Sequence, residues 1–236
     1  MTPKVAVLLA PGINCHEESA FALELAGADP QIVLDTDILE GRKHLRNFAS
    51  LYIPGGFSYG DHFGAGRVAA IRLGPAIREF AALERPILGV CNGFQILMEA
   101  GLFSGPEGQS GGALVQNQKG VFESRSVTLI TVTGTVWTKQ LEQGQALRMP
   151  VAHGEGRWYP PDLCPEHLHV TFRYSWEEQG TEHYPENPNG SPKGLAGLAY
   201  DLVMGMMPHP ERAVVPEQGS TDGLLVLRAF VKLSKS

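Results

Sequence analysis

Short strand-like runs alternate with amphipathic stretches along the first hundred residues. The strand-like runs fall at 5–9, 31–34, 51–53 and 87–90. Apolar positions with helical spacing mark the segments between and after them, at 17–26, 65–73, 76–83 and 94–100. Gly74-Pro75 predicts a break between two of these helices. Strands that alternate with helices in this way predict an α/β fold with a doubly wound, mostly parallel sheet and helices on both faces.

The pattern changes after residue 101. A glycine-rich loop comes first, and apolar runs then predict shorter, partly antiparallel strands at 127–132, 146–152 and 168–174. The stretch 175–192 is rich in Glu, Pro, Asn and Gly and predicts an exposed loop. A hairpin over 194–206 and a helix over 223–233 complete the chain. We expect one domain over residues 1–236, in which a small additional β layer is inserted.

Composition narrows the possible partners. The chain has 236 residues, a net charge of −6 and no basic run, which argues against nucleic acid. Neither a signal peptide nor an apolar run of membrane-spanning length is evident, so no membrane partner is expected. Three widely spaced cysteines make a disulfide framework improbable and favour a reducing, cytoplasmic location.

Cys91 is the candidate nucleophile. It lies in Gly89-Val90-Cys91-Asn92-Gly93, at the corner between a predicted strand and a predicted helix. A side chain at such a corner projects out of the sheet, and the flanking glycines leave room for the tight turn. The start of the helix favours a thiolate, because unpaired N–H groups and the helix dipole stabilise negative charge. A buried cysteine that only packs is the alternative, which the paired glycines disfavour.

A cysteine nucleophile needs a base and a group that orients it. His209 lies between two prolines in Met207-Pro208-His209-Pro210-Glu211-Arg212, after an apolar strand. In an extended backbone residues two apart project to the same side, so Glu211 is expected to orient the His209 ring. The segment leaves the sheet at its end, where catalytic groups of open α/β folds gather. An incidental histidine in a proline-rich surface loop is the competing interpretation.

An oxyanion pocket is the third expected part. Acyl transfer needs N–H donors aimed at the developing oxyanion, and the N–H after a nucleophile is a common donor. Here the donors would be Gly56, in Pro54-Gly55-Gly56 after the third strand, and Asn92. A Gly-Gly pair after a strand is also an ordinary turn.

The remaining histidines give weaker indications. Cys164, His167 and His169 have a spacing that suggests metal ligands, but no second ligand pair accompanies them, so we predict no metal site. The segment 153–157 (His-Gly-Glu-Gly-Arg) is predicted to be a compact polar turn that either contacts a ligand or ends a strand.

Together these motifs resemble class I (triad-type) glutamine amidotransferases. More narrowly, the chain resembles the glutaminase subunits of phosphoribosylformylglycinamidine synthase, from purine biosynthesis, and the resemblance runs nearly end to end. The Cys and His-x-Glu set marks the superfamily, whereas Gly55-Gly56-Phe57-Ser58-Tyr59-Gly60-Asp61 and Asn187-Pro188-Asn189-Gly190-Ser191 are particular to this branch. Further matching segments are 11–15, 89–95, 152–156 and 207–212.

The resemblance implies a role for each candidate residue. Cys91 would be the nucleophile, His209 the base and Glu211 the orienting carboxylate of a catalytic triad. The backbones of Gly56 and Asn92 would form the oxyanion pocket. The residues implied to hold glutamine are Gln95, Asn117 and Phe122. The chain departs from many small bacterial subunits at Phe63-Gly64, where they carry a bulky apolar residue and an arginine; this affects an expected partner contact and not the triad.

The implied activity is that of a glutaminase that supplies ammonia to a C–N ligase. The partner would be a synthetase subunit, with a small third subunit in many bacteria, that uses ATP and magnesium to make formylglycinamidine ribonucleotide. This chain itself is expected to bind no cofactor, since it carries no phosphate-binding Gly-rich Lys motif. Three alternatives remain: a glutaminase of another complex, a cysteine hydrolase or chaperone-like protein with the same corner, and a non-catalytic regulatory subunit.

Overall fold

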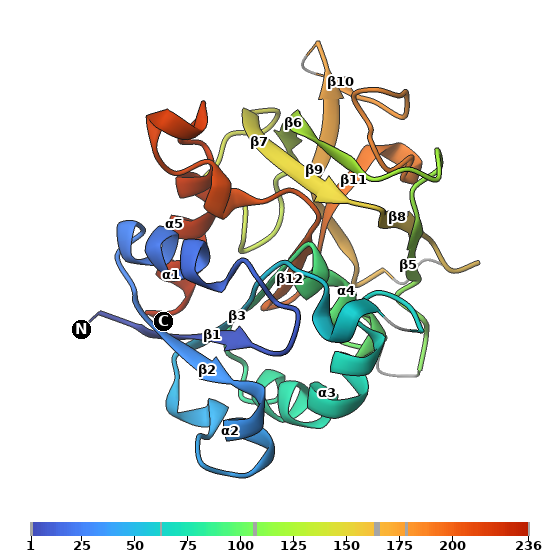
Figure 1. Cartoon of the computed structure of the whole chain (residues 1–236). Helices are drawn as coiled ribbons and strands as arrows, with labels where there is room; N and C mark the ends of the chain where they lie inside the picture. The colour runs from blue at the N-terminus through green and yellow to red at the C-terminus, as the bar shows by residue number, and fades with distance from the viewer. Residues whose placement is uncertain (1, 62, 106–107, 163–165, 178, 236) are drawn as a thin grey trace.

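The computed structural model describes every residue except 1, 62, 106–107, 163–165, 178 and 236 (Figure 1). Cys164, considered above as a metal ligand, lies outside the described residues. In the part of the chain that is described, no helix is both long and apolar enough to cross a membrane.

The parallel part of the main sheet comes mostly from the N-terminal half. β1 (Lys4–Leu9) lies between β2 (Asp29–Leu34) and β3 (Ser50–Ile53), and β4 (Ile87–Val90) pairs with β3. β12 (Val203–Met206) returns from the C-terminal part of the chain and pairs in parallel with β4. β3, β4 and β12 are buried along their whole length, as expected for parallel strands covered on both faces.

Helices cover both faces of the parallel strands (Figure 1). α1 (His16–Leu25) packs against α5 (Gly223–Leu233), and α3 (Arg67–Ala81) packs against α4 (Asn92–Glu99). A short helix, α2 (Asp35–Leu39), follows β2 and contacts α3. The predicted α/β class with helices on both faces is confirmed.

The predicted break at Gly74-Pro75 is wrong, because α3 is one helix with Pro75 inside it. A proline inside a helix costs about 3 kcal/mol through its missing N–H and its clash with the preceding turn. Pro75 lies on the exposed face of α3, near Ile71, where water can bind the freed carbonyl. The opposite face buries Leu73, Ile77 and Phe80 in the core, and this burial outweighs the local penalty.

Antiparallel strands extend the same sheet. β11 (Leu195–Tyr200) forms a hairpin with β12, and β9 (His169–Trp176), β6 (Glu123–Thr131) and β7 (Ala146–His153) follow in that order. The two-residue strand β10 (Gln179–Gly180) pairs with β9. The main sheet is therefore mixed, with parallel strands on one side of β12 and antiparallel strands on the other.

A separate two-stranded sheet joins β5 (Ala113–Gln116) to β8 (Glu155–Tyr159). The compact turn expected at 153–157 is thus a strand-to-strand corner: His153 ends β7, and β8 begins two residues later. β8 alternates buried and partly or fully exposed positions, with Trp158 inside, which is the pattern of a half-buried strand.

The exposed loop predicted at 175–192 is only partly exposed. Asn187, Asn189 and Ser191 are buried, and Asn189 donates to the Gly156 carbonyl at 2.7 Å. Polar side chains can be buried here because they satisfy backbone groups of neighbouring loops. Composition alone does not distinguish such a segment from a solvated loop.

Candidate active site

Cys91 forms the corner between β4 and α4. Its backbone has φ 52° and ψ −108°, a conformation that residues other than glycine rarely adopt. The corner is held by the Cys91 N–H, which donates to the Met206 carbonyl at 2.8 Å, and by the Gln95 N–H, which donates to the Cys91 carbonyl at 3.1 Å. A strained strand-to-helix turn of this kind is the usual support of a nucleophile at a sheet end, so the structure places Cys91 where the candidate nucleophile was expected.

His209 and Glu211 form a buried pair just after β12. His209 Nδ1 lies 2.6 Å from Glu211 Oε1, and the two side chains are 2% and 0% exposed. The Tyr52 hydroxyl donates to the other carboxylate oxygen at 3.2 Å. The extended backbone expected between the two residues is absent, because Pro210 begins a 3₁₀ turn at Pro210–Arg212. The turn, and not strand alternation, directs Glu211 toward the ring.

The electrostatics of this pair favour opposite charges. Burial disfavours the imidazolium, but the charges of Glu211 and Cys91 outweigh it and raise the pKa of His209 well above its usual value. Burial alone would raise the pKa of Glu211, but the charge and hydrogen bond of His209 lower it. Among the described residues, His209 Nε2 has no hydrogen-bond partner, so this atom is available to a bound substrate.

Gly55 lets the nucleophile and the base approach each other. A Cβ at this position would lie 2.7 Å from Cε1 of His209 and 3.4 Å from Cβ of Cys91. Cys15 Sγ reaches the same point, at 3.2 Å. A side chain larger than hydrogen would therefore separate the reacting groups.

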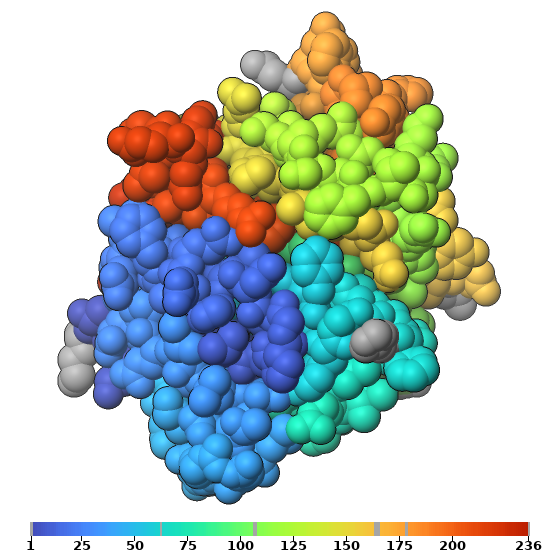
Figure 2. Space-filling view, in the orientation of Figure 1, coloured from blue at the N-terminus to red at the C-terminus, as the bar shows by residue number. Residues whose placement is uncertain are grey.

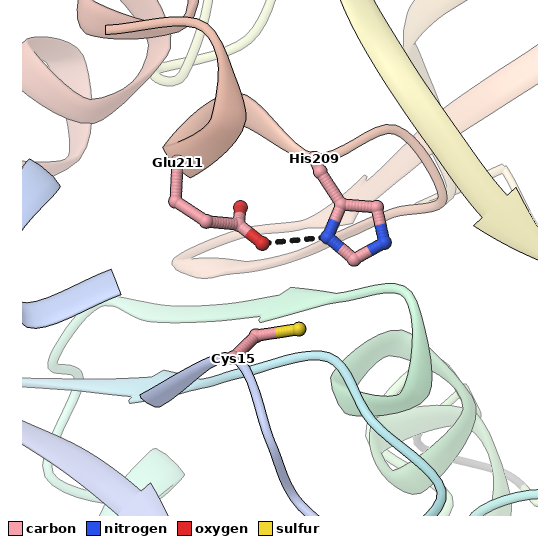
Figure 3. Close-up of side chains that lie close together, drawn as sticks. All are labelled: Cys15, His209 and Glu211. Atoms are coloured by element: carbon pink, nitrogen blue, oxygen red, sulfur yellow. Dashed lines mark hydrogen bonds and ion pairs between the residues drawn. The ribbon is translucent and has the colours of Figure 1, made fainter. Parts of the chain in front are cut away.

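Cys15 is a second cysteine beside the pair, and its sulfur points toward the His209 ring (Figure 3). Ligand atoms of Cys15, His209 and Glu211 all lie within 4.8 Å of one another, and this set of donors suits zinc chemically. However, Arg212 Nη2 donates to Cys15 Sγ at 3.2 Å, and its positive charge opposes a metal ion there. Burial raises the pKa of the Cys15 thiol, which favours its neutral form. We interpret Cys15, His209 and Glu211 as a cluster held by hydrogen bonds and not as a metal centre.

A cavity of about 140 Å³ opens beside Cys91. It brings together the C-terminal edge of the parallel strands, the start of α4 and the β7–β8 corner. The lining residues that matter most here are Gly56, Asp61, Cys91, Gln95, Phe122 and Glu155.

Asn92 connects the cavity to the loop that follows β3. As the first residue of α4, it has a backbone N–H without an intrahelical partner, as an oxyanion donor requires. Its side-chain Oδ1 accepts from the Ser58 N–H at 3.0 Å, and Nδ2 donates to Gln95 Oε1 at 2.9 Å and to Asp61 Oδ1 at 3.2 Å. Gly56, the second expected donor, lines the same cavity.

Gln95 and Phe122 reach the cavity in different ways. Gln95 Nε2 donates to the Glu155 carbonyl at 2.8 Å, so its amide nitrogen is already bonded and braces the β8 side of the cavity. Phe122 is 52% exposed, and its ring centroid lies 6.3 Å from that of Phe57. In Figure 2 the cyan segment after β3 meets the green segment that leads into β6.

Asn117 lies behind the cavity, against His153. Its Nδ2 donates to the carbonyls of Val121 at 3.0 Å and His153 at 2.8 Å. Asn117 Oδ1 therefore faces His153 Nδ1, at 3.1 Å, and that ring nitrogen carries the proton. Burial lowers the pKa of His153 to about 3, so the ring is neutral. Asn117 thus orients His153, while His153 itself lines the cavity.

Three titratable residues of the cavity lining were not assigned a role from the sequence: Asp61, His153 and Glu155. All three belong to motifs singled out there, the loop after β3 and the His-Gly-Glu segment. The available signal was that Asp61 follows a strand and that His153 and Glu155 flank the corner between two strands. The strand pairing that brings β7 and β8 beside Cys91 could not be inferred from local patterns.

Comparison with known proteins places this chain in a family. The model of the CobB/CobQ-like glutamine amidotransferase domain matches residues 2–223. Phosphoribosylformylglycinamidine synthase subunit PurQ of Thermus thermophilus is 41% identical over 96% of this chain and 97% of its own length. The subunit of the same name from Pyrococcus furiosus is also 41% identical, over 99% of both chains.

A solved structure agrees with these relatives. A chain in the structure of PurLQS from Thermotoga maritima superposes with a TM-score of 0.83 at 35% identity. The match covers 98% of this chain and 99% of that chain. The likeness extends through both the parallel and the antiparallel parts of the sheet.

Proposed function

Since this chain belongs to the family of CobB/CobQ-like glutamine amidotransferase domains, we propose that it is the glutaminase subunit of a phosphoribosylformylglycinamidine synthase. The observation that carries the proposal is the convergence at Gly55 of the strained Cys91 corner and the buried His209–Glu211 pair. The two PurQ relatives, matched over nearly their whole length, support the choice of synthase.

The first half of the reaction makes a thioester. The Cys91 thiolate attacks the side-chain amide carbon of glutamine, and the carbonyl oxygen becomes an oxyanion beside the backbone N–H groups of Gly56 and Asn92. His209, held by Glu211, transfers a proton from Nε2 to the departing nitrogen, and ammonia leaves. The raised pKa of His209 suits this step, because the ring then carries a proton when the leaving group needs it.

The second half of the reaction restores the enzyme. His209 removes a proton from a water molecule, which attacks the γ-glutamyl thioester and releases glutamate and the Cys91 thiolate. Gln95 supports this geometry by joining Asn92 to the Glu155 carbonyl. Phe122 lines the cavity with about half of its surface exposed, and there it limits the access of bulk water.

The ammonia is destined for a partner. In bulk water most ammonia is protonated and no longer nucleophilic, so we infer direct transfer to a synthetase subunit that binds ATP, magnesium and formylglycinamide ribonucleotide. A small third subunit completes the complex. The Thermotoga maritima structure that this chain matches is described as PurLQS, which supports an assembly of this kind.

We place this reaction in a reducing cytosol and in one domain spanning residues 1–236. Cys15 and Cys91 are both free thiols, which suits that compartment. The antiparallel strands continue the parallel sheet, which supports a single folding unit.

The test measures glutamate release by the chain alone and then with its synthetase components, magnesium, nucleotide and substrate. Strong stimulation by the partners is expected, and Cys91→Ala should abolish it while ammonia-dependent synthesis persists. Labelling with a diazoketone analogue of glutamine should modify Cys91 and should persist in Cys15→Ala. If the assembled wild-type complex releases no glutamate, the chain is a non-catalytic subunit and the proposal fails.

A further inference from the structure

The cavity beside Cys91 is acidic in a way the triad chemistry does not require. Asp61 and Glu155 both line it, and no lysine or arginine is among its lining residues in the described part of the chain. A glutamine whose amide reaches Cys91 brings two further charged groups with it, an α-ammonium and an α-carboxylate. The excess of negative charge in the cavity matches the first of these.

Among the residues that the structure describes, none is a cationic partner of Asp61. Among the described residues no ion pair involves its carboxylate, which is partly buried between the loop after β3 and the start of α4. Burial raises the pKa of Asp61, and the negative charge of Glu155 acts in the same direction. Hydrogen bonds from Gly66 and Asn92 offset this only in part. The ionised form of a desolvated carboxylate like this one is stabilised when a cation binds beside it.

The carboxylate is also held in a fixed position. The Asn92 side chain donates to Asp61 Oδ1 at 3.2 Å, and Asn92 directly follows the nucleophile. The loop before Asp61 is tied down by backbone bonds from Phe57 to Gly12, at 2.8 Å, and from Tyr59 to Pro11, at 2.7 Å. Because the loop is ordered before substrate arrives, little conformational entropy is lost on binding.

Other side chains of the cavity are less suited to this role. Gln95 has its amide nitrogen bonded to the Glu155 carbonyl and its amide oxygen bonded to Asn92. Glu155 reaches the cavity from the β8 side on a longer and more flexible side chain. Asp61 is the carboxylate that accepts a hydrogen bond from the side chain of Asn92, the residue after Cys91.

We propose that Asp61 binds the α-ammonium group of glutamine and so selects α-amino acid amides over amides that lack this group. The proposal rests on the glutaminase function above and adds a specificity-determining residue to it. Asp61 would act on substrate binding and not on bond breaking, so its role differs from the roles of Cys91, His209 and Glu211.

The test crosses one variant with one change in the substrate. The substrates are L-glutamine and glutaramate, the same amide with hydrogen in place of the ammonium. The assembled complex is used as wild type and as Asp61→Asn, which preserves shape and can still accept from Asn92. Formation of the carboxylate product, glutamate or glutarate, is measured for each pair. Asp37→Asn, on α2 outside the cavity, is the matched control for loss of one carboxylate.

A charge-assisted hydrogen bond predicts that the wild-type complex prefers glutamine by about 10- to 100-fold in kcat/KM. Asp61→Asn should lose that preference, mainly through a higher KM for glutamine, while glutaramate hydrolysis and ammonia-dependent synthesis stay near wild type. Asp37→Asn should keep the preference.

Each other outcome has a distinct meaning. If Asp61→Asn slows both substrates equally, or leaves the preference intact, Asp61 only anchors its loop and the inference is wrong, although the glutaminase function stands. Loss of the preference in Glu155→Gln but not in Asp61→Asn would transfer the role to Glu155. If the wild-type complex hydrolyses neither substrate, the proposed function itself fails and the inference fails with it.

Discussion

Glu211 is the residue on which the state of the candidate base depends. It accepts from Tyr52 through one oxygen and pairs with His209 through the other, at 2.6 Å, with no exposed surface. Two opposed effects act on His209: burial lowers its pKa, and the charge of Glu211 raises it, together with that of Cys91. Which form of the ring is present therefore depends on a charge two residues away.

Replacement of Glu211 by glutamine tests this dependence. Glu211→Gln removes the charge and keeps the shape, so burial should dominate and the pKa of His209 should fall. We expect kcat for glutamine hydrolysis to fall by about 10²- to 10⁴-fold, since the general acid and base would be in the wrong protonation state or tautomer. NMR titration of the His209 ring, together with the pH profile of kcat, measures both effects.

Tyr52→Phe is the matched control, because it removes a hydrogen bond to the same carboxylate but leaves its charge. Its effect on the His209 pKa should be much smaller. An unchanged His209 pKa in Glu211→Gln would show that the carboxylate only holds the ring in place.

For single residues, the sequence predicted which side chains are chemically reactive better than it predicted which residues they contact. Cys91, His209 and Glu211 could be placed because strands, prolines and glycines are local signals and their geometry follows from a few neighbouring residues. Asn117 was expected to hold glutamine, which stays a prediction; in the structure its side chain bonds to the His153 carbonyl and faces the His153 ring. Asp61 lies in a motif that predicts no role for it, because its position in the cavity depends on Asn92, a residue 31 positions away.

The elements show where local propensity yields to packing. The predicted and observed bounds of α5 coincide at Gly223–Leu233, since its apolar positions keep a helical period along the whole segment. At Pro75 the local signal predicted a helix end, but α3 continues because its buried face packs on the core. Strand pairing was the least predictable feature: β5 pairs with β8, whose first residue, Glu155, lines the cavity.

The connection between β6 and β7 shows how one side chain can hold two elements together. Trp137 is 1% exposed, its ring stacks on Phe230 of α5 at 6.0 Å, and its Nε1 donates to the Asp201 carbonyl at 2.9 Å. Trp137→Ala should lower the free energy of unfolding by about 3–5 kcal/mol, because a large cavity opens between α5 and the antiparallel strands. Urea unfolding measures the loss.

Trp176→Ala is the comparison for this prediction. Trp176 is 57% exposed at the end of β9, so its removal should change stability by no more than about 0.5 kcal/mol. Similar losses of stability in the two variants would contradict the prediction, because the buried Trp137 would then stabilise the fold no more than an exposed tryptophan does.

On the scale of the whole molecule, the site exists because the two parts of the sheet meet. The parallel part supplies Cys91 and the loop that carries Asp61, and β7, from the antiparallel part, brings His153 to the same cavity. β12 is the strand at the junction, and the segment that follows it carries His209 and Glu211. Alternating strands and helices predicted the first part, but the order in which later strands join the sheet is set by long-range contacts that local patterns do not encode.

The two histidines of the site should give the whole protein opposite responses to pH. Burial lowers the pKa of His153 to about 3, so as pH falls below about 6.5 the unfolded chain takes up a proton that the folded chain does not. Stability should then fall by up to about 1.4 kcal/mol per pH unit. His209, whose pKa is raised in the folded state, contributes stability that is fully present below about pH 6.5 and is lost as pH rises through its folded pKa.

The acid side of this curve can be assigned to one residue. His153→Gln should flatten the fall between about pH 6.5 and 5, a range in which Glu211, whose pKa is lowered, keeps its charge. The same variant should leave the alkaline side unchanged, because above about pH 6.5 the His153 ring is neutral in both the folded and the unfolded chain. Urea unfolding at several pH values gives the slope, with exposed His183→Gln as the control that should retain it. An acid slope that survives in His153→Gln would mean that His153 takes up its proton in the folded protein, and the neutral, Asn117-oriented ring described for the cavity would then be wrong.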